Sequence, residues 1–280
     1  MNTTKVMSKN RITGGTILLY AIYFLLLAFY IFPLFWMFSS SLKTTQEITR
    51  IPPTLWPSEL SLKGFIKVWQ PIFGRFFLNS FIYAGGSMVI ALFTSSLIGF
   101  IIVTYPSKLG TLLSWSAICM IMIPFTILVI PLYLLEVKLH LLNSYAGMIA
   151  PRIVYPFGIF FMQLAVQTIP GDLVDAAKID GCSPMEIYWL IVVPLLKTSM
   201  ATLATLEFVW RWNELIWPLI VASTEKLFPI TVGLASLVDP YFIDFDQYLA
   251  ACVMVVAPII VMFLFLQKYF VEGIAITGLK

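Results

Sequence analysis

Six stretches of this chain are apolar over about 20 or more residues, and this pattern constrains the fold more than any other feature. They lie at about 14–38, 77–104, 111–135, 144–168, 199–222 and 247–267. A helix needs about 20 mainly apolar residues to cross the hydrocarbon core of a bilayer. The sequence therefore predicts an all-α polytopic membrane protein, with six transmembrane helices in one transmembrane domain over residues 1–280.

The composition argues against a soluble fold and against several kinds of function. Only 11% of the residues are charged and 60% are hydrophobic, whereas soluble domains have about 25% charged and 45–50% apolar residues. The net charge of +3 is small and its basic residues are scattered, so we expect no nucleic-acid partner. The cysteines and the single histidine lack metal-ligand spacing, so we expect neither a metal site nor catalytic residues: Cys119, Cys182, Cys252 and His140.

The second predicted span carries a small residue at every fourth position: Ser87, Ala91, Ser95 and Gly99. Small side chains on one helix face allow a second helix to approach closely in a membrane. The stripe predicts close packing, either against another helix of this chain or against a second subunit. Each of the other five spans contains a proline that invites a kink: Pro33, Pro124, Pro156, Pro218 and Pro258.

A polar loop at residues 170–197 separates the fourth and fifth spans, and its capping residues predict two short helices. Asp172 can cap a first helix of about nine residues, whose early turns hold Asp175, Ala176 and Ala177. The helix should end at Asp180, because Gly181 can adopt the positive φ of a helix C-terminus.

A second helix should begin at Ser183-Pro184-Met185-Glu186, which is a capping box with proline at the first helical position, and should end before Pro194. The small alanines of the first helix would let another protein come close. This pattern therefore predicts that the loop is a docking surface for a partner protein. A helical loop that binds nothing is the alternative.

The segment from Asp175 to Gly181, followed by Ile191-Val192-Val193-Pro194, resembles the EAA loop of binding-protein-dependent ABC importer permeases. Three more segments are similar to the carbohydrate-uptake branch of that family: Leu78-Asn79-Ser80, Trp212-Asn213-Glu214 and the ending at 267–273. In length the chain resembles the shorter of the two permeases in maltose-type systems.

The resemblance implies that the loop is a coupling helix seated on a cytoplasmic ATPase subunit. The implied docking residues are Asp175, Ala176, Ala177, Asp180, Gly181, Ser183, Glu186 and Pro194. Asp175 stands where the family has glutamate, which shortens the acid's reach toward a basic residue of the ATPase by one methylene. Cys182 replaces the family's alanine after the glycine.

The resemblance also implies an assembly: a second permease subunit, two ATPase subunits and an extracytoplasmic solute-binding protein in the bacterial inner membrane. Both termini would be cytoplasmic, which the basic tail with Lys5, Lys9 and Arg11 also favours. The chain has no G-x-x-x-x-G-K-[ST] loop. We therefore expect no cofactor on it and no enzymatic activity of its own, with ATP and Mg²⁺ bound by the ATPase subunits.

The implied function is import of a sugar or oligosaccharide by alternating access. An importer of the same class for a non-sugar polar solute, such as a glycerophosphodiester or a polyol, is the nearest alternative. An ion-coupled secondary transporter and an intramembrane enzyme are the alternatives from other classes.

Three ionisable residues lie inside the fifth predicted span. Glu207, Arg211 and Glu214 fall within about 60° of one helix face, at spacings that allow opposite charges to pair. Ionisable residues at membrane depth usually face the bundle interior or a water-filled cavity. Together with the neighbouring Asn213, these residues are candidates for the translocation path or for an ion pair that holds helices together.

Overall fold

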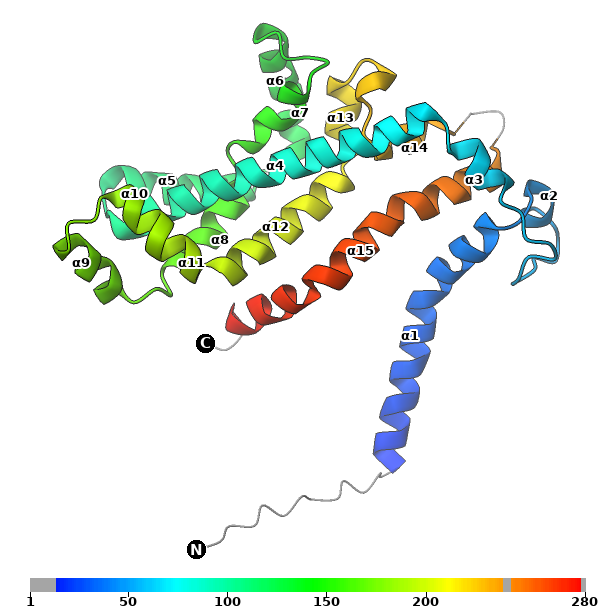
Figure 1. Ribbon diagram of the computed structural model, residues 1–280, viewed down its shortest axis with the longest axis horizontal. Coiled ribbons are helices and arrows are strands. Elements are labelled where there is room, and N and C mark those ends of the chain that lie inside the picture. Colours follow the sequence, from blue (N-terminus) through cyan, green and yellow to red (C-terminus); the bar gives the residue numbers. More distant parts are fainter. Residues whose placement is uncertain (1–13, 239–242, 278–280) are drawn as a thin grey trace, which may run out of the picture. The chain divides into compact units, whose positions relative to one another are not determined.

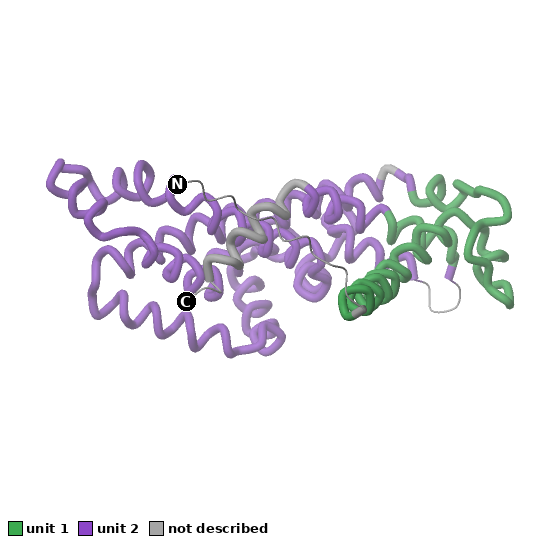
Figure 2. The backbone as a smooth tube through the Cα atoms, turned by 90° about the horizontal axis from the view of Figure 1, so that it is seen from below, with its two compact units in different colours: residues 1–68, 244–253 green, residues 69–243, 254–280 purple. Residues whose placement is uncertain are grey.

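The computed structural model describes residues 14–238 and 243–277, without the side chains of Pro71 and of residues 265–277 (Figure 1). All regular structure in this part of the chain is helical, which confirms the predicted all-α class. The basic tail with Lys5, Lys9 and Arg11 lies outside the described residues, as do the side chains of the 267–273 segment. Two compact units form, one from residues 1–68 with 244–253 and one from 69–243 with 254–280 (Figure 2).

The first unit contains α1 (Gly14–Ser41), α2 (Thr45–Ile48), α3 (Lys63–Val68) and the first turns of α15 (Phe245–Thr277). α1 is long and apolar enough to cross a membrane, as predicted. A connecting loop at residues 42–62 follows it, and Glu47 fixes this loop. Its Oε1 accepts hydrogen bonds from the Ser58 backbone amide at 2.8 Å and from the Thr54 hydroxyl at 3.1 Å.

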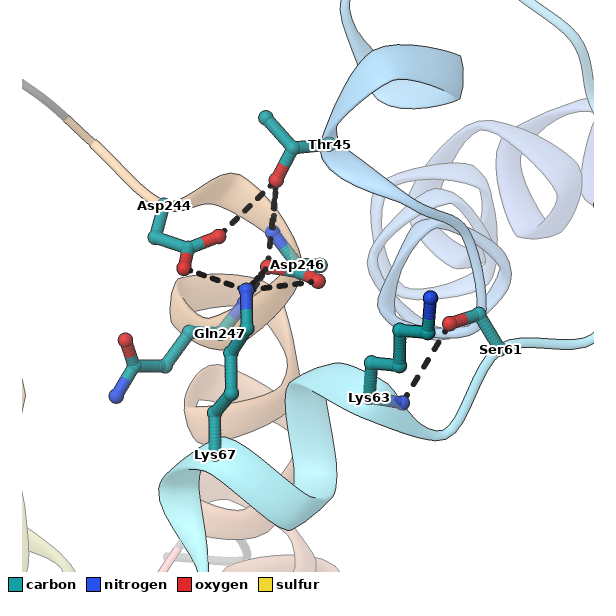
Figure 3. Close-up of polar contacts among 7 residues, drawn as sticks. All are labelled: Thr45, Ser61, Lys63, Lys67, Asp244, Asp246 and Gln247. Atoms are coloured by element: carbon teal, nitrogen blue, oxygen red, sulfur yellow. Dashed lines mark hydrogen bonds and ion pairs between the residues drawn. The ribbon is translucent and has the colours of Figure 1, made fainter.

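A polar cluster joins α2 and α3 to the start of α15 (Figure 3). Lys67 Nζ lies 2.6 Å from Asp244 Oδ2 and 3.1 Å from Asp246 Oδ1, and the Thr45 hydroxyl lies 3.1 Å from Asp244 Oδ1. Gly64, one turn before Lys67, permits this approach, because a Cβ there would lie 2.2 Å from the backbone oxygen of Asp246. The backbone contact and the ion pairs therefore fix α3 against α15 at one point.

The second unit contains the remaining helices: α4 (Pro71–Thr104), α5 (Lys108–Ile121), α6 (Phe125–Lys138), α7 (Tyr145–Ile149), the 3₁₀ turn η1 (Ala150–Arg152), α8 (Pro156–Val166), α9 (Gly171–Ile179), α10 (Pro184–Ile187), the π-helical turn η2 (Tyr188–Val192), α11 (Val193–Leu195), α12 (Lys197–Trp212), α13 (Ile216–Val221), the 3₁₀ turn η3 (Glu225–Leu227), α14 (Ile230–Ser236) and the rest of α15.

Three of the described helices, α1, α4 and α15, can each cross a membrane unbroken, and the described part reaches six spans when bent helix pairs are counted as one span each. The bends measure 111° between α5 and α6, 46° between the 145–152 and 156–166 helices, and 80° between the 184–195 segment and α12. The predicted number of spans is therefore compatible with the structure, but only α1, α4 and α15 are continuous.

The predicted fifth span, 199–222, is wrong as a continuous helix, because α12 ends at Trp212 and α13 begins at Ile216. Pro218 explains the position of the break. It has no N–H to offer the carbonyl of Glu214 four residues earlier. The Thr231 hydroxyl of α14 donates to that carbonyl instead, at 2.8 Å.

α4 is the central helix of the second unit and packs along α8 and α12 (Figure 1). The small-residue stripe forms this contact, since its members are buried. A Cβ on Gly99 would lie 2.8 Å from the backbone nitrogen of Gln163 in α8, and one on Gly158 would lie 2.4 Å from Ser95 Oγ. Of the two packing partners that the sequence left open, the structure shows a helix of the same chain.

Candidate functional site

The first helix of the 170–197 loop forms as predicted. α9 spans Gly171–Ile179, which is nine residues, and Gly181 follows with a φ of +83°. The prediction that Asp172 caps this helix is wrong. The N-cap position is Pro170, two residues earlier, so Asp172 lies in the first turn. There its negative charge interacts favourably with the helix dipole.

α9 divides its side chains between the protein interior and the surface. Val174 and Ala177 are 8% and 6% exposed and join the hydrophobic core. Ala176 is exposed, as are the predicted docking residues Asp175, Asp180 and Gly181. The two alanines therefore differ: Ala177 packs inside this chain, and only Ala176 offers a small side chain to a partner.

Asp175 is an exposed residue of α9, and its carboxylate forms an ion pair within the chain. Its Oδ1 is 3.0 Å from Nζ of Lys178, one turn later. Lys178 Nζ also lies 5.6 Å from the centre of the Tyr105 ring. Both Asp175 and Lys178 line a cavity of about 180 Å³ that α9 shares with α4 and α8. The carboxylate is thus partly engaged with its own subunit.

The second helix begins with the predicted capping box. The Ser183 backbone amide donates to Glu186 Oε2 at 2.7 Å, and the Ser183 hydroxyl accepts from the Glu186 amide at 3.3 Å. Hydrogen bonding of the exposed Glu186 carboxyl with the Ser183 side chain, and then with the Ser183 backbone amide, holds its pKa below the ordinary value. Both docking candidates, Ser183 and Glu186, are therefore held in fixed positions at the loop surface.

The prediction that this helix ends before Pro194 is wrong. The chain continues from α10 through the π-helical turn and α11, so that Pro194 lies inside the helical segment and the bend falls at Leu196. The π-helical turn ends at Val192, two residues before the proline, whose missing N–H disrupts the regular α-helical pattern of hydrogen bonds.

Tyr188 attaches this segment to α4, a contact that the sequence did not reveal. Its side chain is 1% exposed, and its hydroxyl lies 2.7 Å from the hydroxyl of Ser96. Ile187 and Val192 on the same segment are also buried in the core. A tyrosine in a polar loop with aliphatic neighbours at helical spacing could have indicated a buried face.

The three ionisable residues of the fifth span pair with one another. Arg211 Nε lies 3.0 Å from Glu207 Oε1, and Arg211 Nη1 forms a further ion pair with Glu214. The Glu207 side chain is fully buried, and those of Arg211 and Glu214 are 11% and 12% exposed. The neighbouring Asn213 is exposed and donates to the Val209 carbonyl at 2.8 Å.

Two residues that the sequence reasoning missed complete this charge network, which consists of Tyr83, Arg152, Glu207, Arg211 and Glu214. Arg152 Nη2 lies 2.8 Å from Glu214 Oε1, and the Tyr83 hydroxyl donates to Glu214 Oε2 at 2.5 Å. Arg152 could have been found, because a lone arginine inside an apolar span needs an acidic partner. The network connects α4, η1 and α12, which is the arrangement expected of an ion pair that holds helices together.

Known proteins resemble this chain over nearly its whole length. It is 33% identical to the arabinooligosaccharides transport system permease protein AraQ of Bacillus subtilis (strain 168), over 92% of this chain and 94% of that protein. It is 30% identical to the sn-glycerol-3-phosphate transport system permease protein UgpE of Salmonella typhi, over 96% and 98%.

A solved structure has the same fold. The crystal structure of a bacterial ABC transporter involved in the import of the acidic polysaccharide alginate contains a chain with 20% sequence identity and a TM-score of 0.83. The match covers 95% of this chain and 100% of that one.

The family model for binding-protein-dependent transport system inner membrane components matches residues 96–276. This region includes both the 170–197 loop and the acidic and basic residues of the charge network. The chain therefore belongs to this family and is a membrane-integral permease subunit of an ABC importer.

Proposed function

We propose that this permease imports an oligosaccharide. It pairs with a second permease and receives its solute from an extracytoplasmic binding protein. Two ATPase subunits bind ATP and Mg²⁺ and dock on the 170–197 loop, which faces the cytoplasm together with both termini. The observation that carries the docking role is the exposure of one face of α9 while Val174 and Ala177 attach the helix to the core.

The relatives support an oligosaccharide as solute. Two arabinooligosaccharide permeases, from Bacillus subtilis and Halalkalibacterium halodurans, share 33% and 36% identity with this chain. A second candidate is sn-glycerol-3-phosphate or a related polar phosphate, because the permease of that name in Salmonella typhi shares 30% identity.

The contacts of the loop suggest how ATPase movement reaches the spans. Val174 and Ala177 pack into the same core cluster as Phe100 of α4 and Met162 of α8. Tyr188 is tied to α4 through Ser96. A displacement of α9 would therefore move the helices that cross the membrane. ATP-driven closure of the ATPase pair would then change the permease from inward-facing to outward-facing.

The test uses the complete complex in liposomes, with binding protein supplied on one side. An Ala176→Trp change adds bulk to the exposed docking face, and Ala176→Ser is the matched control that keeps the side chain small. We expect Ala176→Trp to abolish ATP-dependent uptake while Ala176→Ser retains it. Unchanged uptake with Ala176→Trp would refute docking at this loop.

The solute is tested separately in the same liposomes. We expect uptake of a labelled arabinooligosaccharide that unlabelled oligosaccharide competes away and sn-glycerol-3-phosphate does not. Uptake of labelled sn-glycerol-3-phosphate alone would replace the first candidate with the second.

A further inference from the structure

One side chain on the docking helix is apolar, long and directed away from the protein. Ile179, the last residue of α9, is 86% exposed, whereas Val174 and Ala177 of the same helix are buried and Leu173 is 46% exposed. Ile179 follows Ala176 by three residues and Asp172 by seven. At 3.6 residues per turn, these three positions lie within about 60° of one another on the helix surface.

The surroundings of Ile179 leave room for a partner. A Cβ added to Gly171 or to Gly181, at the two ends of α9, would meet no atom within 4 Å. Ala176 is exposed and its side chain is a single methyl group, so the helix surface beside Ile179 carries no projecting side chain at that position. A projecting apolar side chain next to a low surface is the shape that fits into a cleft of another protein.

Asp175 of the same helix already has a cationic partner within the chain. Asp175 is paired with Lys178 at 3.0 Å, and both residues border the cavity beneath α9. An ATPase cation would have to share that carboxylate with Lys178. Exposed ion pairs of this kind contribute little to affinity, whereas removing an aliphatic side chain from water contributes in proportion to its area.

We propose that Ile179 is the main anchor of the ATPase subunit, inserting into a cleft of that subunit, and that Asp175 orients the contact without supplying most of its affinity. This inference rests on the proposed docking function and adds the residue that holds the partner.

The experiment measures binding of the ATPase subunit that co-purifies with the wild-type complex. Permease pairs carrying each variant are reconstituted in nanodiscs, stripped of ATPase and titrated with the purified subunit. We expect Ile179→Ala to weaken binding by roughly 10- to 50-fold, from the apolar area lost. Asp175→Ala should weaken it by roughly 2- to 5-fold. Ile179→Leu should bind within threefold of wild type.

Two controls exclude other causes of weaker binding: loss of any exposed isoleucine, and loss of folding. Ile66→Ala shortens an isoleucine side chain in the same way at a position of α3 that is 71% exposed, and it should leave ATPase binding unchanged. Each variant must also show the thermal unfolding temperature of the wild type, which is expected because the Ile179 side chain is exposed.

The outcomes distinguish the inference from the proposed function. If Ala176→Trp abolishes binding while Ile179→Ala stays within threefold of wild type, the loop docks but Ile179 is not the anchor. A larger loss for Asp175→Ala than for Ile179→Ala would likewise overturn the inference. If neither Ala176→Trp nor Ile179→Ala affects binding, the loop is not the docking site and the proposed function fails with it.

Discussion

Replacing Arg152 by methionine should destabilise the permease strongly, because it removes one of two positive charges from the buried network. Arg152 Nη2 lies 2.8 Å from Glu214 Oε1, and the two side chains are 8% and 12% exposed. Without Arg152, Glu207 and Glu214 share Arg211 alone. Breaking a buried pair by removing one partner costs about 3–5 kcal/mol, mainly because a charge is left uncompensated.

Thermal unfolding of the purified complex measures this cost. At about 2–4 °C per kcal/mol for a chain of this size, the loss corresponds to a decrease in Tm of roughly 6–20 °C. Lys108→Met, a substitution at an exposed position at the start of α5, is the control and should change Tm little.

A second variant tests the physical reason. Arg152→Met combined with Glu214→Gln leaves Arg211 and Glu207 as a balanced pair, so the double variant should be more stable than Arg152→Met alone. If instead the two substitutions destabilise the protein additively, charge balance is not what the network provides. A decrease in Tm below about 2 °C for Arg152→Met would refute the argument from burial, since it would correspond to less than about 1 kcal/mol.

Three further predictions concern glycines and one carboxylate. Gly99→Ala should destabilise the α4–α8 contact by about 1–3 kcal/mol through overpacking. Gly85→Ala on the same helix is the control, because a Cβ there meets nothing within 4 Å. The unfolding temperature of each variant measures the effect. Gly64→Ala should increase amide exchange in α3 and the first turn of α15, with Gly74→Ala as the unhindered control. Hydrogen bonds from Ser58, the backbone amide first, hold the pKa of Glu47 below its ordinary value of 4.5. The stability that Glu47 gives the 42–62 loop is therefore complete above that value and lost as the pH falls through the depressed pKa. The hydrogen-exchange rate of the Ser58 amide, corrected for its intrinsic pH dependence, should rise as the pH falls through that pKa. Glu47→Gln should abolish this rise.

Most residue patterns within one helix were read well from the sequence, except the Asp172 cap and the helix end before Pro194. The nine-residue length of α9, the positive φ of Gly181 and the Ser183–Glu186 capping box depend on neighbours within a few positions, and the structure confirms them. The pairing of Arg211 with Glu207 and Glu214 is local in the same sense.

Features that depend on distant residues were missed. The α12 break needs Thr231 to satisfy a carbonyl that Pro218 leaves without a donor, and Thr231 belongs to another helix. Arg152 joins the charge network across 62 residues of sequence. The burial of Ala177 could not be separated from the exposure of Ala176, because the side of α9 that packs inward is decided by α4 and α8.

The charge network has a consequence for how the transporter responds to the membrane potential. Moving one elementary charge through the full potential changes the energy by about 2.3 kcal/mol per 100 mV. Two arginines and two glutamates sum to zero, so these four side chains can shift together through the bilayer field without net electrical work. A movement of these four side chains as one unit would therefore carry no gating charge.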